Sequence, residues 1–170
     1  MRTRRNSLRS PCDDYRTPGA YFITVCVFRR RPVLSHVAHG RVWPSPIGRL
    51  VLREWTDLPR RCGWLAVDSL VVMPDHLHGI LWITDALARQ RPRPEAGPSG
   101  RSVGAAFGQL KSRVTKAAVR LGLWPREERL WQRGYHDRIV RSESGLWAAR
   151  GYIAANPIRW ERAHGGGGEG

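Results

Sequence analysis

LAVDSLVVMPDHLHGILWIT, residues 65–84, is the segment from which the architecture of this chain can be worked out. Residues 65–73 and 76–84 are two strand-like runs, and only Pro74 and Asp75 separate them. Because Pro and Asp favour tight turns, the two runs are predicted to pair as an antiparallel hairpin.

Apolar patterns on both sides of this hairpin predict the other elements. Strands are expected from β-branched and aromatic runs, and helices from apolar residues that recur at helical spacing. The predicted elements are a strand at 21–28, a helix near 46–59 after Ser45-Pro46, a helix along the apolar stripe from 103 to 121, a strand at 135–140, and a last helix at 143–155 that Asn156-Pro157 ends. This order, β-α-β-β-α-β-α, predicts an α+β fold in which helices pack on an antiparallel sheet in a ferredoxin-like manner.

The length of the chain favours one domain. With 170 residues, of which 41% are hydrophobic, it can bury one substantial core, which we assign to residues 19–160. Residues 1–18 contain Arg, Ser and Pro without periodicity and are predicted to form a basic flexible arm. A Pro/Gly-rich loop is expected at 89–101 and a disordered tail at 161–170.

The charge balance favours a polyanionic partner. The chain has 29 basic and 14 acidic residues, a formal net charge of +15, and nearly all the basic residues are Arg. A GC-rich genome explains a preference for Arg over Lys, but it does not explain the excess of positive charge. Nucleic acid is therefore the expected partner.

Cysteine usage and hydropathy predict where in the cell the protein is located. Cys12, Cys26 and Cys62 are an odd number without a C-x-x-C pair, so neither a disulfide framework nor a zinc knuckle is predicted. No stretch is apolar enough to cross a bilayer, and the basic start is not followed by the apolar core of a signal peptide. The expected location is a bacterial-type cytoplasm, in association with the nucleoid, without membrane contact.

Two histidines on the second strand of the hairpin form half of a possible metal site. Residues two apart on a strand point to the same face, so His76 and His78 present both imidazoles on one side, while Leu77 packs on the other. Two nitrogen ligands leave positions open for a third protein ligand, water and a phosphate oxygen on Mg²⁺ or Mn²⁺. A pair of this kind is also found as a purely structural feature, and the spacing alone does not choose between the two.

The last predicted helix offers a nucleophile. Tyr152 and Asn156 are four residues apart and lie one above the other, beside the apolar stripe of the helix rather than within it. Tyr152 is therefore expected near the sheet and within reach of a substrate. The alternative is a tyrosine that packs as the flank of an amphipathic helix.

The chain resembles the REP-associated tyrosine transposases, a branch of the single-tyrosine HUH transposases. Five segments carry the resemblance, in order and over roughly residues 19 to 160 of the chain. They are YFITV at 21–25, VVMPDHLHGI at 71–80, LKS at 110–112 with VTK at 114–116, WQRGYHDRIVR at 131–141, and YIAANP at 152–157.

The resemblance implies a role for each candidate residue. His76 and His78 would be the metal pair and Tyr152 the nucleophile, while Asn156 falls where related transposases place a polar third ligand, often Gln, which is one carbon longer. His136 lies in a family motif and is a further ligand, a base, or a core histidine bonded to backbone. The predicted DNA contacts are Lys111, Arg113, Lys116, Arg120 and Arg133, and an alternative for the cations of the 103–121 helix is simple solvation.

The implied reaction is cleavage and rejoining of single-stranded DNA. Tyr152 attacks a scissile phosphodiester with the help of Mg²⁺ or Mn²⁺ and leaves a 5′-phosphotyrosine and a free 3′-hydroxyl. A second 3′-hydroxyl can reverse this step on a new strand. The implied substrate is single-stranded or hairpin DNA, and a homodimer is possible. The rivals are a catalytically silent hairpin-binding protein and a metal nuclease that uses water.

Overall fold

A four-stranded antiparallel sheet forms the centre of the protein in the computed structural model, which describes residues 18–84 and 103–164. Its strands lie in the order β4-β5-β1-β6, and each neighbouring pair is antiparallel. They are β1 (Gly19–Cys26), β4 (Leu65–Val72), β5 (His76–Ile83) and β6 (His136–Val140). Residues 1–17 of the predicted arm at 1–18, the predicted loop at 89–101, and residues 165–170 of the predicted tail at 161–170 lie outside the described residues.

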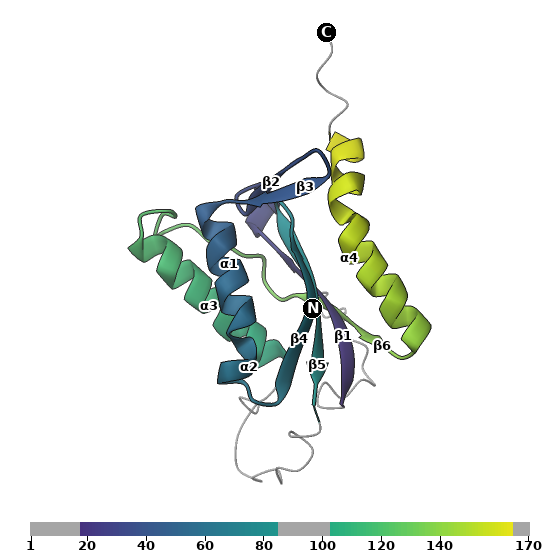
Figure 1. Cartoon of the computed structure of the whole chain (residues 1–170). Helices are drawn as coiled ribbons and strands as arrows, with labels where there is room; N and C mark the ends of the chain where they lie inside the picture. The colour runs from purple at the N-terminus through teal and green to yellow at the C-terminus, as the bar shows by residue number, and fades with distance from the viewer. Residues whose placement is uncertain (1–17, 85–102, 165–170) are drawn as a thin grey trace, which may run out of the picture.

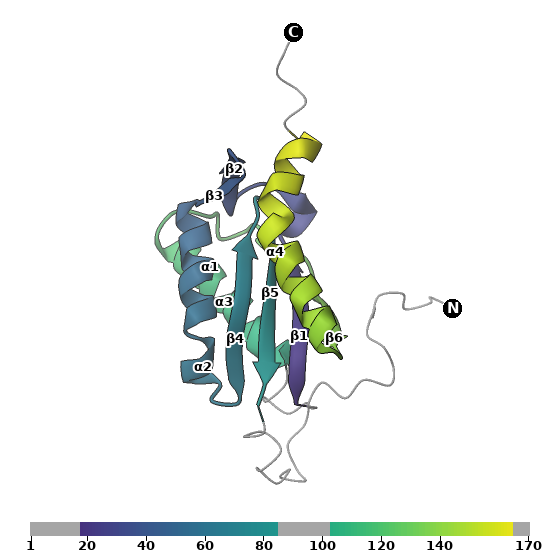
Figure 2. The ribbon, with the colours of Figure 1, turned by 45° about the vertical axis from the view of Figure 1, so that its right-hand side comes forward.

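Helices cover both faces of this sheet. Figure 1 shows the sheet nearly edge-on, with α1 (Pro46–Thr56), α2 (Leu58–Arg61) and α3 (Val103–Arg120) on one side and α4 (Glu143–His164) on the other. Figure 2 shows α4 in front of the sheet, where it runs roughly along the direction of the strands. The predicted α+β architecture is confirmed, because β1-α1-β4-β5-α3-β6 is a split βαβ arrangement with α4 added on the opposite face.

The larger core lies between the sheet and the pair α1 and α3. It contains the inward side chains of the central strands and the apolar stripe of α3, as its spacing predicts. Gly79 in β5 marks the closest approach of α1, since a Cβ at this position would lie 2.3 Å from the ring of Trp55. The glycine that follows the histidine pair therefore has a packing role.

The smaller core lies between the sheet and α4. Ala149 and Ile153 of α4 pack there on Ile80 and Met73, with half-buried aromatic residues around them. This cluster has fewer buried residues than the larger core, and polar contacts between α4 and the sheet lie beside it.

The last helix is longer than Asn156-Pro157 predicts. Proline lacks an N–H donor and clashes with the carbonyl four residues earlier, so it normally ends a helix. Here Pro157 is buried inside α4, and the helix continues through residues 161–164, which the sequence assigns to the disordered tail. The turns after Pro157 pack Trp160 against the smaller core, and these tertiary contacts outweigh the local preference.

A short hairpin absent from the sequence prediction meets the second half of α4. It consists of β2 (Ser35–Ala38) and β3 (Arg41–Pro44), joined by His39 and Gly40 with φ of 53° and 65°. Both backbone N–H groups of this turn donate to the Glu161 carboxylate at 2.7 Å. A Cβ on Gly40 would also lie 3.0 Å from Ile158, so the turn is fitted closely to α4.

None of the helices within the described residues is long and apolar enough to span a membrane.

Candidate active site

The histidine pair lies at the start of β5, on the face of the sheet that α4 covers. His76 and His78 are each 8% exposed, and Leu77 between them belongs to the core on the opposite face. The strand therefore separates the residues as their spacing predicts. The two Nε2 atoms are 3.1 Å apart, so both rings direct the same nitrogen toward one point.

Each imidazole has a second partner that orients it. His76 Nδ1 lies 2.5 Å from a carboxylate oxygen of Asp75, and His78 Nδ1 lies 2.8 Å from the hydroxyl of Thr24. An ionised carboxylate only accepts hydrogen bonds, so a neutral His76 carries its proton on Nδ1 and leaves Nε2 bare. The Thr24 hydroxyl can accept from His78 Nδ1 in the same way, and His78 Nε2 is then bare as well.

The separation of the two Nε2 atoms fits a shared metal ion. Two nitrogens bound to one ion at about 2.1 Å in adjacent octahedral positions lie about 3.0 Å apart. A carboxylate behind a metal-binding histidine is the usual arrangement that fixes its tautomer. The described residues contain no group of three His, Cys, Asp or Glu side chains suited to a metal. A metal bound here therefore needs an amide, water or substrate to complete its ligands.

Burial keeps both imidazoles neutral at neutral pH. Desolvation lowers the pKa of His76, and the hydrogen bond and charge of Asp75 partly oppose this effect. Desolvation, the neighbouring His76 and the charge of Arg30 lower the pKa of His78 to about 4. Neutral imidazole is the form that binds a metal, so the pair is ready to act as ligands without losing a proton.

The candidate nucleophile lies directly against this pair. The ring of Tyr152 meets the ring of His78 edge-on with centroids 5.3 Å apart, and it is 5.9 Å from the ring of Phe22. Tyr152 is 39% exposed, so it is both packed on the site and open to a substrate. One turn later, Asn156 is buried, at 7% exposed, on the same helix.

A partly buried carboxylate fixes α4 close to Tyr152. The Asp68 carboxylate accepts two hydrogen bonds from the Arg150 guanidinium, at 3.1 and 2.6 Å, and one from Trp82 Nε1 at 3.1 Å. Asp68 follows Val67, which packs on the larger core, so alternation along β4 places the Asp68 side chain on the α4 face, at an irregularity in the pairing of β4 with β5. These hydrogen bonds hold the pKa of Asp68 far below its usual value. Arg150 thus ties α4 to the sheet two residues before Tyr152.

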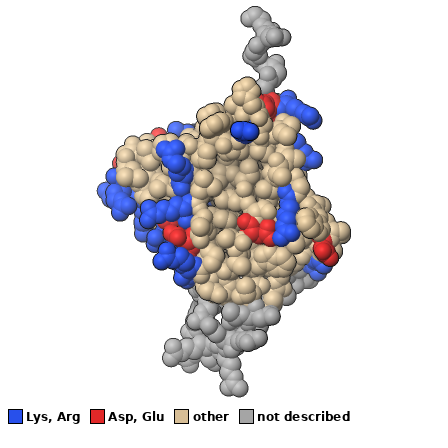
Figure 3. All heavy atoms as spheres, in the orientation of Figure 1, with Lys and Arg blue, Asp and Glu red and all other residues tan. Residues whose placement is uncertain are grey.

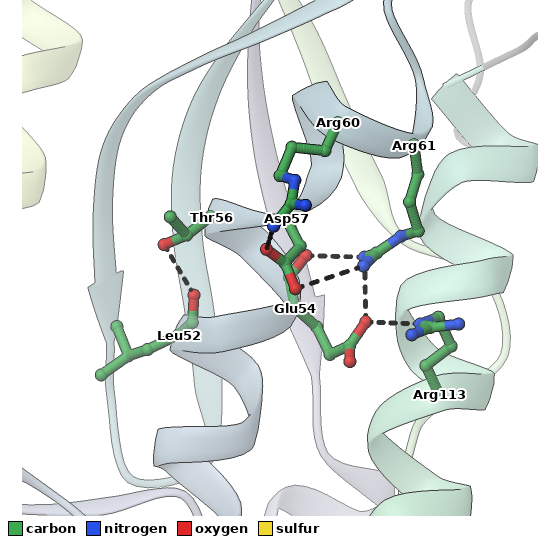
Figure 4. A network of polar contacts seen from close by, with 7 residues as sticks. All are labelled: Leu52, Glu54, Thr56, Asp57, Arg60, Arg61 and Arg113. Carbon is green, nitrogen blue, oxygen red and sulfur yellow. Dashed lines mark hydrogen bonds and ion pairs between the residues drawn. The ribbon is translucent and has the colours of Figure 1, made fainter.

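Two of the predicted DNA contacts bind partners within the protein, although the side chain of Arg113 remains half exposed. Lys111 Nζ donates to the backbone carbonyls of Gln132 and Gly134, and burial lowers its pKa to about 8. Arg113 donates to Glu54 at 2.7 Å. Figure 4 shows that Arg61 shares the same carboxylate, so this cluster joins α1, α2 and α3.

The other predicted DNA contacts are on the surface. Lys116 and Arg120 are exposed on α3, and Arg133 is exposed before β6. Because α3 and α4 cover opposite faces of the sheet, the cations of α3 lie on the far side from the histidine pair. Figure 3 shows Lys and Arg gathered over α1 and α3, with further ones beside α4.

His136 shares a face with the histidine pair but is not a core residue. It pairs with Thr24 in the register of β1 and β6, and Thr24 pairs with His78 in the register of β1 and β5. The three side chains therefore form one row on the α4 side of the sheet. His136 is exposed, which rules out the interpretation of a buried histidine bonded to backbone.

Five tryptophans are candidate platforms on which unpaired bases could stack, and they divide between core and surface. Trp64, Trp124 and Trp131 are buried, whereas Trp43 is 52% exposed and Trp147 is 63% exposed. Only the last two retain a face that a base can reach.

Several residues around the site were missed by the sequence analysis. Thr24 and Arg138 reach it through strand register, which no local pattern reveals. Arg159 is seven residues after Tyr152, two helical turns further on, and this spacing was an available signal. Asp75 was treated as a turn residue, although an acidic residue beside a histidine pair also suggests a supporting carboxylate.

Sequence comparisons find a relative of this chain but no matching family model. No family model matches the chain. An uncharacterized protein of Haemophilus influenzae is 29% identical over 171 residues, which cover 93% of this chain and 91% of that protein.

Two solved structures are similar. A provisionally assigned transposase from Deinococcus radiodurans aligns with 86% of this chain and 95% of its own, with a TM-score of 0.49 and 21% identity. A REP-associated tyrosine transposase bound to a REP hairpin aligns with 89% of this chain and 74% of its own, with a TM-score of 0.58 and 20% identity. The chain therefore has the fold of the REP-associated tyrosine transposase.

Proposed function

We propose that this protein is a transposase that cleaves and rejoins single-stranded DNA through a covalent bond to Tyr152. The observation that carries the proposal is the contact between Tyr152 and His78, whose Nε2 atom lies 3.1 Å from that of His76. A half-exposed tyrosine packed against a pair of imidazoles that could hold a metal is the combination that phosphodiester transfer to a side chain requires.

The chemistry is an exchange of phosphodiester bonds. The Tyr152 oxygen forms a bond to phosphorus as the bond to the 3′-oxygen breaks, which gives a 5′-phosphotyrosine and a 3′-hydroxyl. The phenolic proton is lost and the leaving oxygen gains one, so the step is balanced. The bond energy is conserved, and a second 3′-hydroxyl can attack the phosphotyrosine without ATP.

His76 and His78 are the residues that would hold a divalent cation, Mg²⁺ or Mn²⁺. When bound, the ion polarises the scissile phosphate. The amide of Asn156 is the proposed third ligand, since it is buried one turn after Tyr152 on the same helix. Asp75 and Thr24 contact the two Nδ1 atoms and would so leave both Nε2 atoms available to a bound ion.

Single-stranded DNA with hairpins is the proposed substrate. The net charge of +15 supports a polyanionic partner, and the structure with the same fold is bound to a REP hairpin. Exposed Trp43 and Trp147 are candidates for stacking on unpaired bases.

The test is the formation of a covalent adduct. Purified protein is incubated with Mn²⁺ and labelled single-stranded oligonucleotides that contain hairpins from repeats beside its own gene. A band that resists denaturation is expected for the wild type and for Tyr135→Phe, a matched control whose ring packs on Phe107 of α3. No band is expected for Tyr152→Phe.

The rival functions give other results. If the oligonucleotides bind and are neither cut nor joined to protein, the chain is a DNA-binding module. If Tyr152→Phe still cuts the strand, water is the nucleophile. Either result would overturn the proposal.

A further inference from the structure

We propose that Arg138 and Arg159 bind phosphates of the DNA strand on the two sides of Tyr152, a role that rests on the proposed function. The strand then crosses the α4 face of the sheet, from β6 to the second half of α4. The predicted cations of α3 are on the other face and do not contact it.

Arg159 lies on the same side of α4 as the nucleophile. It follows Tyr152 by seven residues, which is two helical turns, and its Cζ atom is 5.2 Å from the centroid of the Tyr152 ring. The side chain is exposed, and it has no ion-pair partner among the described residues.

Arg138 reaches the site from the edge strand of the sheet. It pairs with Phe22 in the register of β1 and β6, so both side chains point to the α4 face. Its Cζ atom is 5.8 Å from the centroid of the Phe22 ring, and that ring is 5.3 Å from His78 and 5.9 Å from Tyr152. Arg138 is also exposed, without an ion pair among the described residues.

Within the described ranges, these two arginines lack the acidic partner that other arginines beside the sheet have. Arg30 pairs with Asp75, Arg113 with Glu54, and Arg150 with Asp68, so each has an internal counter-ion. Arg138 and Arg159 instead rest on aromatic rings that surround the histidine pair. A guanidinium stacked on a ring keeps its N–H edge free, and that edge matches two phosphate oxygens.

The test measures DNA affinity without cleavage. In a Tyr152→Phe background, the affinity for a fluorescein-labelled oligothymidylate is measured by anisotropy at increasing salt. Arg138→Gln and Arg159→Gln are each expected to weaken binding several-fold, and to reduce the slope of log K against log salt by about 0.7 for each phosphate that the variant no longer binds. Arg138→Lys and Arg159→Lys are expected to retain the slope, because Lys still binds phosphate as a point charge.

The controls remove the same charge elsewhere. Arg53→Gln, on the exposed side of α1, is expected to bind as the parent does. Arg120→Gln tests the α3 surface directly and is also expected to have little effect. Thermal melting checks that each variant is folded.

The possible failures are distinct. If the wild type forms the Tyr152 adduct and both Gln variants bind with the parental affinity and slope, the inference about the strand path is overturned and the proposed function stands. If only Arg120→Gln loses affinity, the inference about the strand path is likewise overturned, and the proposed function stands. If the parent binds no single-stranded DNA and the wild type forms no adduct, both proposals fall.

Discussion

Asp75 and Thr24 each contact one Nδ1 atom of the histidine pair and so orient the two rings. A substitution of Asp75 tests this role. Asp75→Asn removes the negative charge behind His76 while keeping the size of the side chain. We expect Mn²⁺ affinity to fall about tenfold, the lower end of the range for residues that support metal ligands.

Calorimetric titration of Mn²⁺ without DNA measures this effect. Glu127→Gln is the matched control, since it removes one exposed carboxylate in the loop after α3. An unchanged Mn²⁺ affinity in Asp75→Asn would contradict the support role.

The lowered pKa of His78 predicts how stability depends on pH. A histidine with a pKa of about 4 in the folded protein and 6.5 when unfolded binds its proton more readily in the unfolded chain. Its contribution to stability is therefore complete above pH 6.5 and is lost as the pH falls toward 4. This loss amounts to about 3 kcal/mol at most, and His76, whose pKa is also lowered, acts in the same direction.

Urea unfolding at a series of pH values, with chelator present, measures this loss. In His78→Gln the free energy of unfolding should vary less between pH 6.5 and 4 than in the wild type. Equal slopes in the two proteins would show that His78 is not desolvated as described.

Individual residues show where sequence reasoning succeeds and where it stops. His76 and His78 were identifiable because their relationship depends only on strand geometry. Tyr152 needed the resemblance, since one tyrosine on a helix flank has no distinguishing pattern. The internal use of Lys111 was not predictable, because its partners Gln132 and Gly134 are more than twenty residues away along the chain.

At the level of elements, α4 is the one whose position matters most for the proposed chemistry. Asp68→Ala would leave Arg150 and Trp82 without their shared acceptor, at a cost of about 1–3 kcal/mol. We expect faster amide exchange in α4 around Tyr152 and a lower rate of adduct formation, with Mn²⁺ affinity unchanged.

Hydrogen exchange followed by mass spectrometry locates the effect. Asp57→Ala is the control, because it removes an acid that pairs with Arg60 and Arg61 on the other side of the sheet. If α4 exchanges as in the wild type, the contact between Asp68 and Arg150 does not position the helix.

The elements were predicted well where local pattern determines them and poorly where distant contacts do. The boundaries of β4, β5 and β6 follow from alternation and turn residues, and the structure agrees within a residue or two. The end of α4 does not follow, because Trp160 and Glu161 hold the helix beyond Pro157 through contacts with residues more than eighty positions away. The β2–β3 hairpin has strands of four residues, too short for a clear pattern.

For the whole molecule, composition predicted the type of partner but not the surface that meets it. A net charge of +15 gives a field around the entire protein, and four of the five DNA contacts predicted from the sequence lie on α3, namely Lys111, Arg113, Lys116 and Arg120. Sheet topology separates the two faces, and the histidine pair, Tyr152 and two unpaired arginines all lie on the α4 side of the part of the chain that the structure describes.

The histidine pair and Tyr152 are far apart in the sequence, and this separation predicts the order in which their elements fold. The hairpin of β4 and β5, which holds both histidines, forms from neighbouring residues, whereas Tyr152 comes to it on α4, more than seventy residues later. Local contacts form sooner than distant ones, so we expect the histidine pair to be in place while Tyr152 is still free. Pulse-labelled amide exchange during refolding should protect β4 and β5 before α4, and simultaneous protection would contradict this order. A growing chain thus places Tyr152 last, after the histidine pair that it packs against has already folded.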